Sequence, residues 1–94
     1  MSEKSVEMAI RRYLKSIGAK VEKQHGGRFG KSGVPDLLGC YQGRALALEV
    51  KRPGGKPTPL QLKELSEWQQ SGAITAKVES VEDVKKLIEG RVNG

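Results

Sequence analysis

Apolar residues that recur every three or four positions predict a helix over residues 3–17. Ser2 or Ser5 can cap the start of this helix, and Gly18 suits its end. At about 100° per residue, Glu7 falls at the edge of the apolar stripe and leans toward whatever the helix packs on. The stripe consists of Val6, Ala9, Ile10, Tyr13, Leu14 and Ile17.

Shorter apolar runs predict four strands. Residues 19–24 form a partly exposed strand near an edge, and residues 25–33 form a loop rich in glycines and cations. Residues 34–51 hold two apolar runs on either side of Gln42-Gly43, which is the pattern of a β-hairpin. The alternation of Ile74, Ala76 and Val78 predicts the fourth strand.

Two further helices complete the pattern. Thr58, Pro59 and Gln61 combine an N-cap, a first-turn proline and a capping-box glutamine, so a helix should run from there to about residue 71. Ser80 can cap a last helix. The predicted order is α-β-β-β-α-β-α, an α/β (α+β, mixed-sheet) fold. Its first three strands form an antiparallel meander, and its third and fourth strands are parallel. We expect one domain over residues 1–94.

The hairpin places three charged residues at one end of the sheet. In a symmetric hairpin centred between Gln42 and Gly43, Asp36 lies directly opposite Glu49, with Cβ atoms about 4.5–5.5 Å apart. Lys51 follows Glu49 by two residues and therefore points to the same face. Opposed carboxylates repel each other, so this arrangement is unfavourable unless a cation lies between them.

A divalent cation would remove that repulsion. Asp36, Glu49 and the backbone carbonyl of Val50 offer hard oxygen ligands, which suit Mg²⁺ or Mn²⁺. Such an ion can polarise a phosphoryl oxygen and activate water. Lys51 could then orient or deprotonate that water, or offset negative charge developing on phosphorus. A zinc site is not favoured, because the chain has one cysteine and one isolated histidine.

The charge balance agrees with a nucleic-acid partner. The chain of 94 residues has 17 Lys and Arg against 11 Asp and Glu, a net charge of +6, and phosphate neutralisation dominates nucleic-acid affinity. Aromatic residues are sparse, which argues against a stacking platform for single strands. The loops at the Asp36 end of the hairpin carry the candidate backbone-binding residues Arg28, Lys31, Arg52 and Lys56.

The remaining composition limits the setting of the protein. No apolar run is long enough to span a membrane, and the N-terminus lacks the apolar segment of a signal peptide. The single cysteine allows no internal disulfide, and we expect an intracellular, cytoplasmic protein. Cys40 and Trp68 are both interpreted as core residues.

Pro35-Asp36, followed after twelve residues by Glu49-Val50-Lys51, resembles the PD-(D/E)-x-K nuclease motif. Glu7 on the first helix, Gly33-Val-Pro-Asp36, and Gln61 at the start of the middle helix are similar to the VRR-NUC family in particular. The resemblance extends from residue 7 to about residue 78 and is to a minimal stand-alone member, of the kind found in phages and bacteria. In a phage, the compartment would be the host cytoplasm.

This resemblance implies a restriction-endonuclease-like core and metal-dependent phosphodiester hydrolysis. It implies that Asp36 and Glu49 bind Mg²⁺ or Mn²⁺ and that Lys51 is the catalytic lysine. Glu7 would complete the acidic site, directly or through water, and Gln61 would line it. Stand-alone members resemble Holliday-junction resolvases and are associated with homodimers that cut branched DNA.

Other interpretations stay open at this point. A catalytically silent nucleic-acid-binding module would keep the basic loops and use the carboxylates structurally. A nuclease could also act on ordinary duplexes, single strands or RNA. Glu7 could form a helix-surface pair with Arg11, and the capping box by itself accounts for Gln61. The sequence does not choose between a base and an electrostatic role for Lys51, and it does not identify a dimer surface.

Overall fold

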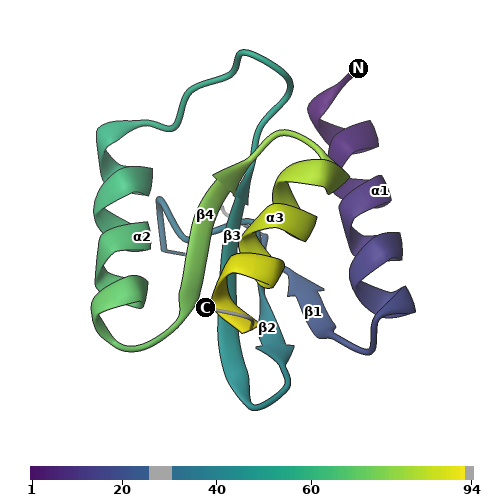
Figure 1. The fold of residues 1–94 in the computed structure, drawn as a ribbon. Coiled ribbons are helices and arrows are strands. Elements are labelled where there is room, and N and C mark those ends of the chain that lie inside the picture. Colours follow the sequence, from purple (N-terminus) through teal and green to yellow (C-terminus); the bar gives the residue numbers. More distant parts are fainter. Residues whose placement is uncertain (26–30, 93–94) are drawn as a thin grey trace.

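Within the part of the chain that the structure describes, three helices pack around one four-stranded sheet (Figure 1). The order of elements is α-β-β-β-α-β-α, which confirms the predicted fold class. The computed structural model describes residues 1–25 and 31–92, the last two of these by their backbone alone. The helices are α1 (Glu3–Ser16), α2 (Pro59–Gln70) and α3 (Val81–Val92). The strands are β1 (Lys20–Lys23), β2 (Leu37–Tyr41), β3 (Arg44–Val50) and β4 (Ile74–Val78).

The predicted caps position the helices. Ser2 accepts a hydrogen bond from the Ser5 backbone N–H at the start of α1, and Ser80 accepts one from the Asp83 N–H at the start of α3. At the start of α2, Thr58 and Gln61 form the complete capping box. These contacts satisfy backbone N–H groups that have no partner within the helix. The helix starts are therefore encoded locally, and tertiary packing has only to orient the helices.

The sheet has the order β1-β2-β3-β4, with antiparallel pairing except between β3 and β4. The observed pairs include Leu37 with Leu48 and Tyr41 with Arg44, so the predicted hairpin register is confirmed. Gln42 and Gly43 form the two-residue turn, with φ of 49° and 80°. Two successive positive φ values are typical of the type I′ turn, whose twist matches the flanking strands.

One face of the sheet carries the main hydrophobic core. Helices α1 and α3 contact each other and cover this face, where α1 buries Val6, Ile10 and Leu14 completely or nearly so. Each fully buried aliphatic side chain contributes roughly 1.5–3 kcal/mol. The core continues through Leu37, Leu46, Leu48, Val50, Ile74, Val78, Val84 and Ile88.

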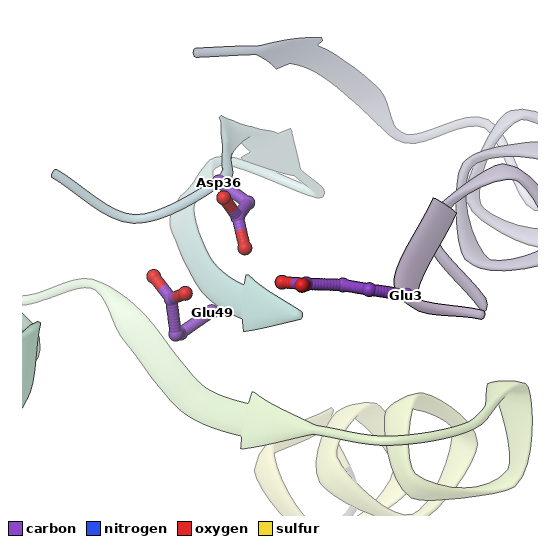
Figure 2. Close-up of side chains that lie close together, drawn as sticks. All are labelled: Glu3, Asp36 and Glu49. Atoms are coloured by element: carbon purple, nitrogen blue, oxygen red, sulfur yellow. The ribbon is translucent and has the colours of Figure 1, made fainter. Parts of the chain in front are cut away.

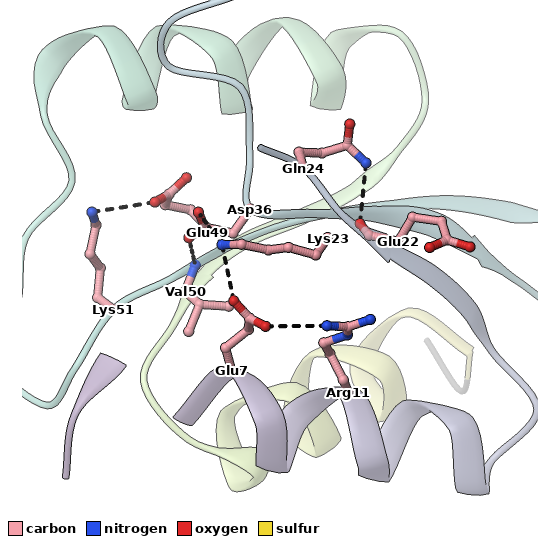
Figure 3. Close-up of polar contacts among 9 residues, drawn as sticks. All are labelled: Glu7, Arg11, Glu22, Lys23, Gln24, Asp36, Glu49, Val50 and Lys51. Atoms are coloured by element: carbon pink, nitrogen blue, oxygen red, sulfur yellow. Dashed lines mark hydrogen bonds and ion pairs between the residues drawn. The ribbon is translucent and has the colours of Figure 1, made fainter. Parts of the chain in front are cut away.

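Helix α2 lies on the opposite face, where it contacts β3 and β4 (Figure 3). Ala47 and Leu65 are buried on this side. Its cover does not extend over all of β2, because Leu38 is half-buried and Cys40 is exposed. The prediction that Cys40 belongs to the core is therefore wrong, and Trp68 is only half-buried. β3, an inner strand, is covered on both faces, and its residues from Leu46 to Val50 are all buried.

Among the described residues, no helix combines the length and the apolar character that a membrane crossing requires.

The close approach of β1 and β2 at Gly39 gives a test of the register. A Cβ atom on Gly39 would lie 1.9 Å from the Lys20 carbonyl oxygen, which is backbone and cannot rotate away. Gly39→Ala should lower the free energy of unfolding by on the order of 2–3 kcal/mol, measured by urea denaturation.

Gly90 provides the matched control. It lies in α3 with nothing within 4 Å of an added Cβ, so Gly90→Ala should leave stability unchanged or raise it by about 0.5–1 kcal/mol. Equal effects of the two substitutions would contradict the strand pairing described here.

Candidate active site

Asp36 is held at the mouth of the hairpin by backbone contacts on both sides. Its Oδ2 accepts a hydrogen bond of 2.9 Å from the Val50 backbone N–H. Its backbone carbonyl accepts one of 2.7 Å from the N–H of Gln24, just after β1. The last pair of the β2–β3 ladder is Leu37 with Leu48, and Asp36 and Glu49 each follow it by one residue, with carboxylate oxygens within 4.8 Å of each other. The carboxylate is therefore positioned by the sheet rather than by a flexible loop.

Glu49 is the most unusual polar residue of the described chain. It is 1% exposed, and neither of its carboxylate oxygens has a hydrogen-bond partner among the described residues. The Lys51 ammonium lies 3.3 Å from its Oε2. A buried carboxylate without donors costs several kcal/mol unless it is protonated or meets a cation.

Burial, followed by the neighbouring Asp36 carboxylate, raises the pKa of Glu49 from its ordinary value of 4.5 to about 7. Asp36 contributes because two negative charges in one low-dielectric site repel each other. Lys51 opposes the shift but does not cancel it. The site thus favours either a proton or an added cation beside Glu49.

A third carboxylate completes an acidic cluster with Asp36 and Glu49. Glu3, in the first turn of α1, brings an oxygen to within 4.8 Å of oxygens of the other two, and Figure 2 shows the three side chains converging. Three hard oxygen donors, among them a buried carboxylate without a hydrogen bond, fit the ligand preference of Mg²⁺ or Mn²⁺. The residues present therefore suit a divalent cation.

Sequence reasoning assigned the helix carboxylate to Glu7 and missed Glu3. Both residues lie on one side of α1, because they are four positions apart. The four-residue spacing is the signal in the sequence that could have identified Glu3. The apolar stripe begins at Val6, so it gives no indication that the first turn of the helix contributes to the site.

Glu7 instead joins a chain of ion pairs next to the cluster (Figure 3). Its Oε1 lies 3.0 Å from the ammonium of Lys23, and its Oε2 lies 3.4 Å from Arg11. Lys23 also reaches Asp36 Oδ1 at 3.3 Å, so it bridges the two carboxylates. Partial burial of Lys23 favours its neutral form, but Glu7 and Asp36 outweigh burial and raise the lysine pKa. Lys23 was not identified from the sequence.

The remaining predicted site residues lie outside the acidic cluster of Glu3, Asp36 and Glu49. Gln61 is half-buried, and its side-chain oxygen accepts a hydrogen bond from the Thr58 N–H. Lys31 forms a 2.8 Å ion pair with Glu64, a buried residue of α2. Arg52 and Lys56 are exposed in the loop after β3, whereas Arg28 lies outside the described residues.

Comparisons with known proteins give consistent similarities. A solved structure described as "VRR_NUC domain" superposes with a TM-score of 0.76 and 32% identity, over 95% of this chain and 97% of that one. Another, described as "VRR_NUC domain protein", has a TM-score of 0.77 over 99% of this chain and 89% of that one; at 19% identity it supports the fold alone. No family model matches the sequence.

A curated phage protein gives a shorter match. The protein named "Putative nuclease p44", from Acyrthosiphon pisum secondary endosymbiont phage 1, is 50% identical over 36 residues. The match covers 37% of this chain and 39% of that protein, so it spans about two-fifths of the curated relative.

The raised pKa of Glu49 predicts how stability depends on pH when no divalent ion is bound. Between 4.5 and about 7, the folded protein retains a proton that the unfolded chain releases. The free energy of unfolding should therefore be highest below pH 4.5 as far as Glu49 is concerned. It should fall by on the order of 3 kcal/mol as the pH rises toward 7.

Thermal unfolding in a chelator between pH 5 and 8 measures this effect. Glu49→Gln removes the titrating group, so the variant should lack this fall in stability. The difference in stability between wild type and variant should therefore be constant above pH 7. If both proteins show the same pH dependence over this range, Glu49 does not carry the proton.

Proposed function

Because this chain belongs to the VRR_NUC family of nucleases, we propose that it is a divalent-metal-dependent endonuclease that hydrolyses phosphodiester bonds in DNA. Residues 1–94 then form one nuclease domain. The observation that carries the proposal is Glu49, a buried carboxylate that accepts no hydrogen bond from the described residues, lies 3.3 Å from the Lys51 ammonium, and meets Asp36 and Glu3 at the end of β3. A purely structural ion pair gives no reason to leave both carboxylate oxygens unbonded.

Asp36 and Glu49 would hold Mg²⁺ or Mn²⁺, with the Val50 carbonyl and Glu3 as further oxygen ligands. Once bound, the ion supplies charge neutralisation and polarises a phosphoryl oxygen of the substrate. Burial of Glu49 strengthens this interaction, because the dielectric constant near the carboxylate is lower than in water. The carboxylates are fixed by the β2–β3 ladder, so little rearrangement accompanies binding.

Lys51 is the candidate catalytic residue next to these ligands. Its side chain is 16% exposed and lies 3.3 Å from Glu49, which holds the ammonium at the cluster. From there it can orient the attacking water, accept its proton, or stabilise the charge that develops on the phosphate oxygens. Gln61 is assigned to the lining of the site, through the side-chain nitrogen that its capping oxygen leaves available.

We also propose the residues that contact the DNA, and the form of DNA that is cut. Arg52 and Lys56 would contact the DNA backbone, together with Lys31 and Arg28. By its resemblance to resolvase-like stand-alone nucleases, the protein would form a homodimer and cut branched DNA such as a four-way junction. Two paired cuts across a junction require two active sites, and the chain supplies one acidic cluster among its described residues.

Cleavage of labelled DNA tests the function directly. We expect the purified protein to cut a four-way junction in Mg²⁺ or Mn²⁺, faster than a flap, duplex or single strand of the same sequence, and not in a chelator. Asp36→Asn, Glu49→Gln and Lys51→Ala should each lower the rate at least about 10²-fold, because each removes a ligand or a charge at the reacting phosphate.

Glu89→Gln and Lys86→Ala are matched controls, since both residues are exposed on α3 and lie outside the acidic cluster. Their rates should equal that of wild type. Symmetric cuts and a sedimentation mass of two chains would support the homodimer. Absence of cleavage on every substrate, with DNA binding that Asp36→Asn leaves intact, would instead favour a silent binding module.

The two acidic residues of α1 should have different roles. We propose that Glu3 is a metal ligand, whereas Glu7 acts through Lys23, which it shares with Asp36. Glu3→Gln should weaken Mn²⁺ binding about tenfold or more by titration calorimetry. Glu7→Gln should change the affinity only while Lys23 is present, because the two residues are coupled.

A double-mutant cycle separates these roles. In a Lys23→Met background, Glu7→Gln should have no further effect on Mn²⁺ affinity, whereas Glu3→Gln should keep its full effect. An equal loss from Glu7→Gln in both backgrounds would make Glu7 a ligand in its own right.

A further inference from the structure

Residues of α1, of β1 and of the turn between them line a basic groove. Both elements lie on the edge of the molecule away from α2 (Figure 1). The volume of the groove is ≈ 520 Å³. Because β1 is the edge strand of the sheet, the groove is open to solvent along one side. Half of its lining residues are cationic, and only one is acidic: it comprises Arg11, Arg12, Lys15 and Lys20, with Glu22, Met8, Ala19 and Val21.

The cations of the groove continue the acidic row of α1. Glu3, Glu7, Arg11 and Lys15 follow one another at four-residue spacing, so they form one stripe along the helix. Each step advances about 6 Å along the axis, which places Lys15 about 18 Å from Glu3. The stripe therefore changes from acidic at the candidate metal site to basic at the far end of the helix.

Two of these cations have no ion pair among the described residues. Arg11 is paired with Glu7, and Lys20 with Glu22 at 2.8 Å, although the Lys20 side chain remains 80% exposed. Arg12 and Lys15 are exposed and take part in none of the ion pairs that the described part of the chain forms. Their charges are thus available to a partner.

The groove is continuous with the candidate active site. Arg11 lines it and also lines the neighbouring hollow that contains Glu3, Glu7, Lys23 and Asp36. A chain of phosphates that leaves the acidic cluster along α1 would therefore meet Arg11 first and then Arg12 and Lys15. On one strand of B-DNA, about 18 Å of helix axis corresponds to roughly five nucleotides at 3.4 Å each.

We propose that this groove binds the sugar-phosphate backbone of the DNA substrate, about three to five nucleotides away from the bond that is cut. The proposal rests on the nuclease function proposed above and assigns that function a second, non-catalytic contact region. Phosphate contacts of this kind fix the position of the duplex without reading its sequence. The groove would thus act together with Arg52 and Lys56, which lie in the loop between β3 and α2.

Salt-dependent binding tests the proposal without requiring cleavage. The affinity for a fluorescein-labelled 30-base-pair duplex is measured by anisotropy in Ca²⁺ at several salt concentrations, for wild type and for an Arg12→Ala/Lys15→Ala variant. Loss of two phosphate contacts should weaken binding about tenfold or more near 0.1 M salt. It should also reduce the slope of log K against log salt by about 1.8.

A Lys63→Ala/Lys86→Ala variant removes the same charge from exposed positions on α2 and α3, and its slope should equal that of wild type. Equal slopes for all three proteins, or equal losses of affinity in both variants, would overturn the proposal. It would also be overturned if the wild-type protein did not bind DNA. Arg12→Gln/Lys15→Gln replaces the alanine variant if the latter unfolds at a lower temperature.

The two proposals can fail separately. If wild type cuts DNA but the groove variant keeps the wild-type slope, the nuclease function stands and the groove proposal is wrong. If wild type cuts no substrate but the groove variant loses slope, the groove binds DNA and the catalytic proposal is wrong. The distance is tested with two duplexes that differ in length by five base pairs. If the groove variant is slower than wild type on the longer duplex but equally fast on the shorter one, the contact lies at the predicted distance.

Discussion

The burial of the Glu49 carboxylate is the constraint on which the rest of the site depends. Glu49 lies on β3, an inner strand of the sheet, and both of its carboxylate oxygens are buried from water. The register of β2 against β3 then fixes Asp36 beside it through the Val50 N–H. A shift of one residue would turn one carboxylate to the opposite face, into the apolar core. Correct strand pairing and assembly of the acidic cluster are therefore one event.

The two faces of the sheet differ in the kind of side chain that they bury. The face under α1 and α3 is filled by aliphatic side chains, whereas the α2 face has small residues and the buried charges. A well-packed core on one face can support an unfavourable carboxylate pair on the other, because the total free energy of folding is what must remain favourable. In the metal-free protein, the acidic cluster lowers stability, and the apolar face offsets that cost.

Local sequence signals predicted most of the fold, whereas long-range contacts decided the details of the site. The hairpin turn at Gln42-Gly43, the capping box at Thr58 and the carboxylate pair followed from spacing alone. Glu3 and Lys23 did not, because their approach to Asp36 depends on how α1 and β1 dock against the sheet. Cys40 was misplaced for a similar reason: strand alternation assigns a residue to a face but does not say how far a helix extends over it.

Lys23 has a consequence for how the cluster would accept an ion. Its ammonium already touches both Asp36 and Glu7, so the metal-free protein holds an internal cation at the edge of the site. A divalent ion arriving at Asp36 therefore competes with a tethered monovalent one. The affinity for the ion is then set by the difference between two interactions of the Asp36 carboxylate, one with the ion and one with the Lys23 ammonium. The displaced Lys23 stays paired with Glu7. The protein thus carries its own counterion, which keeps the acidic pocket partly neutral before any ion arrives.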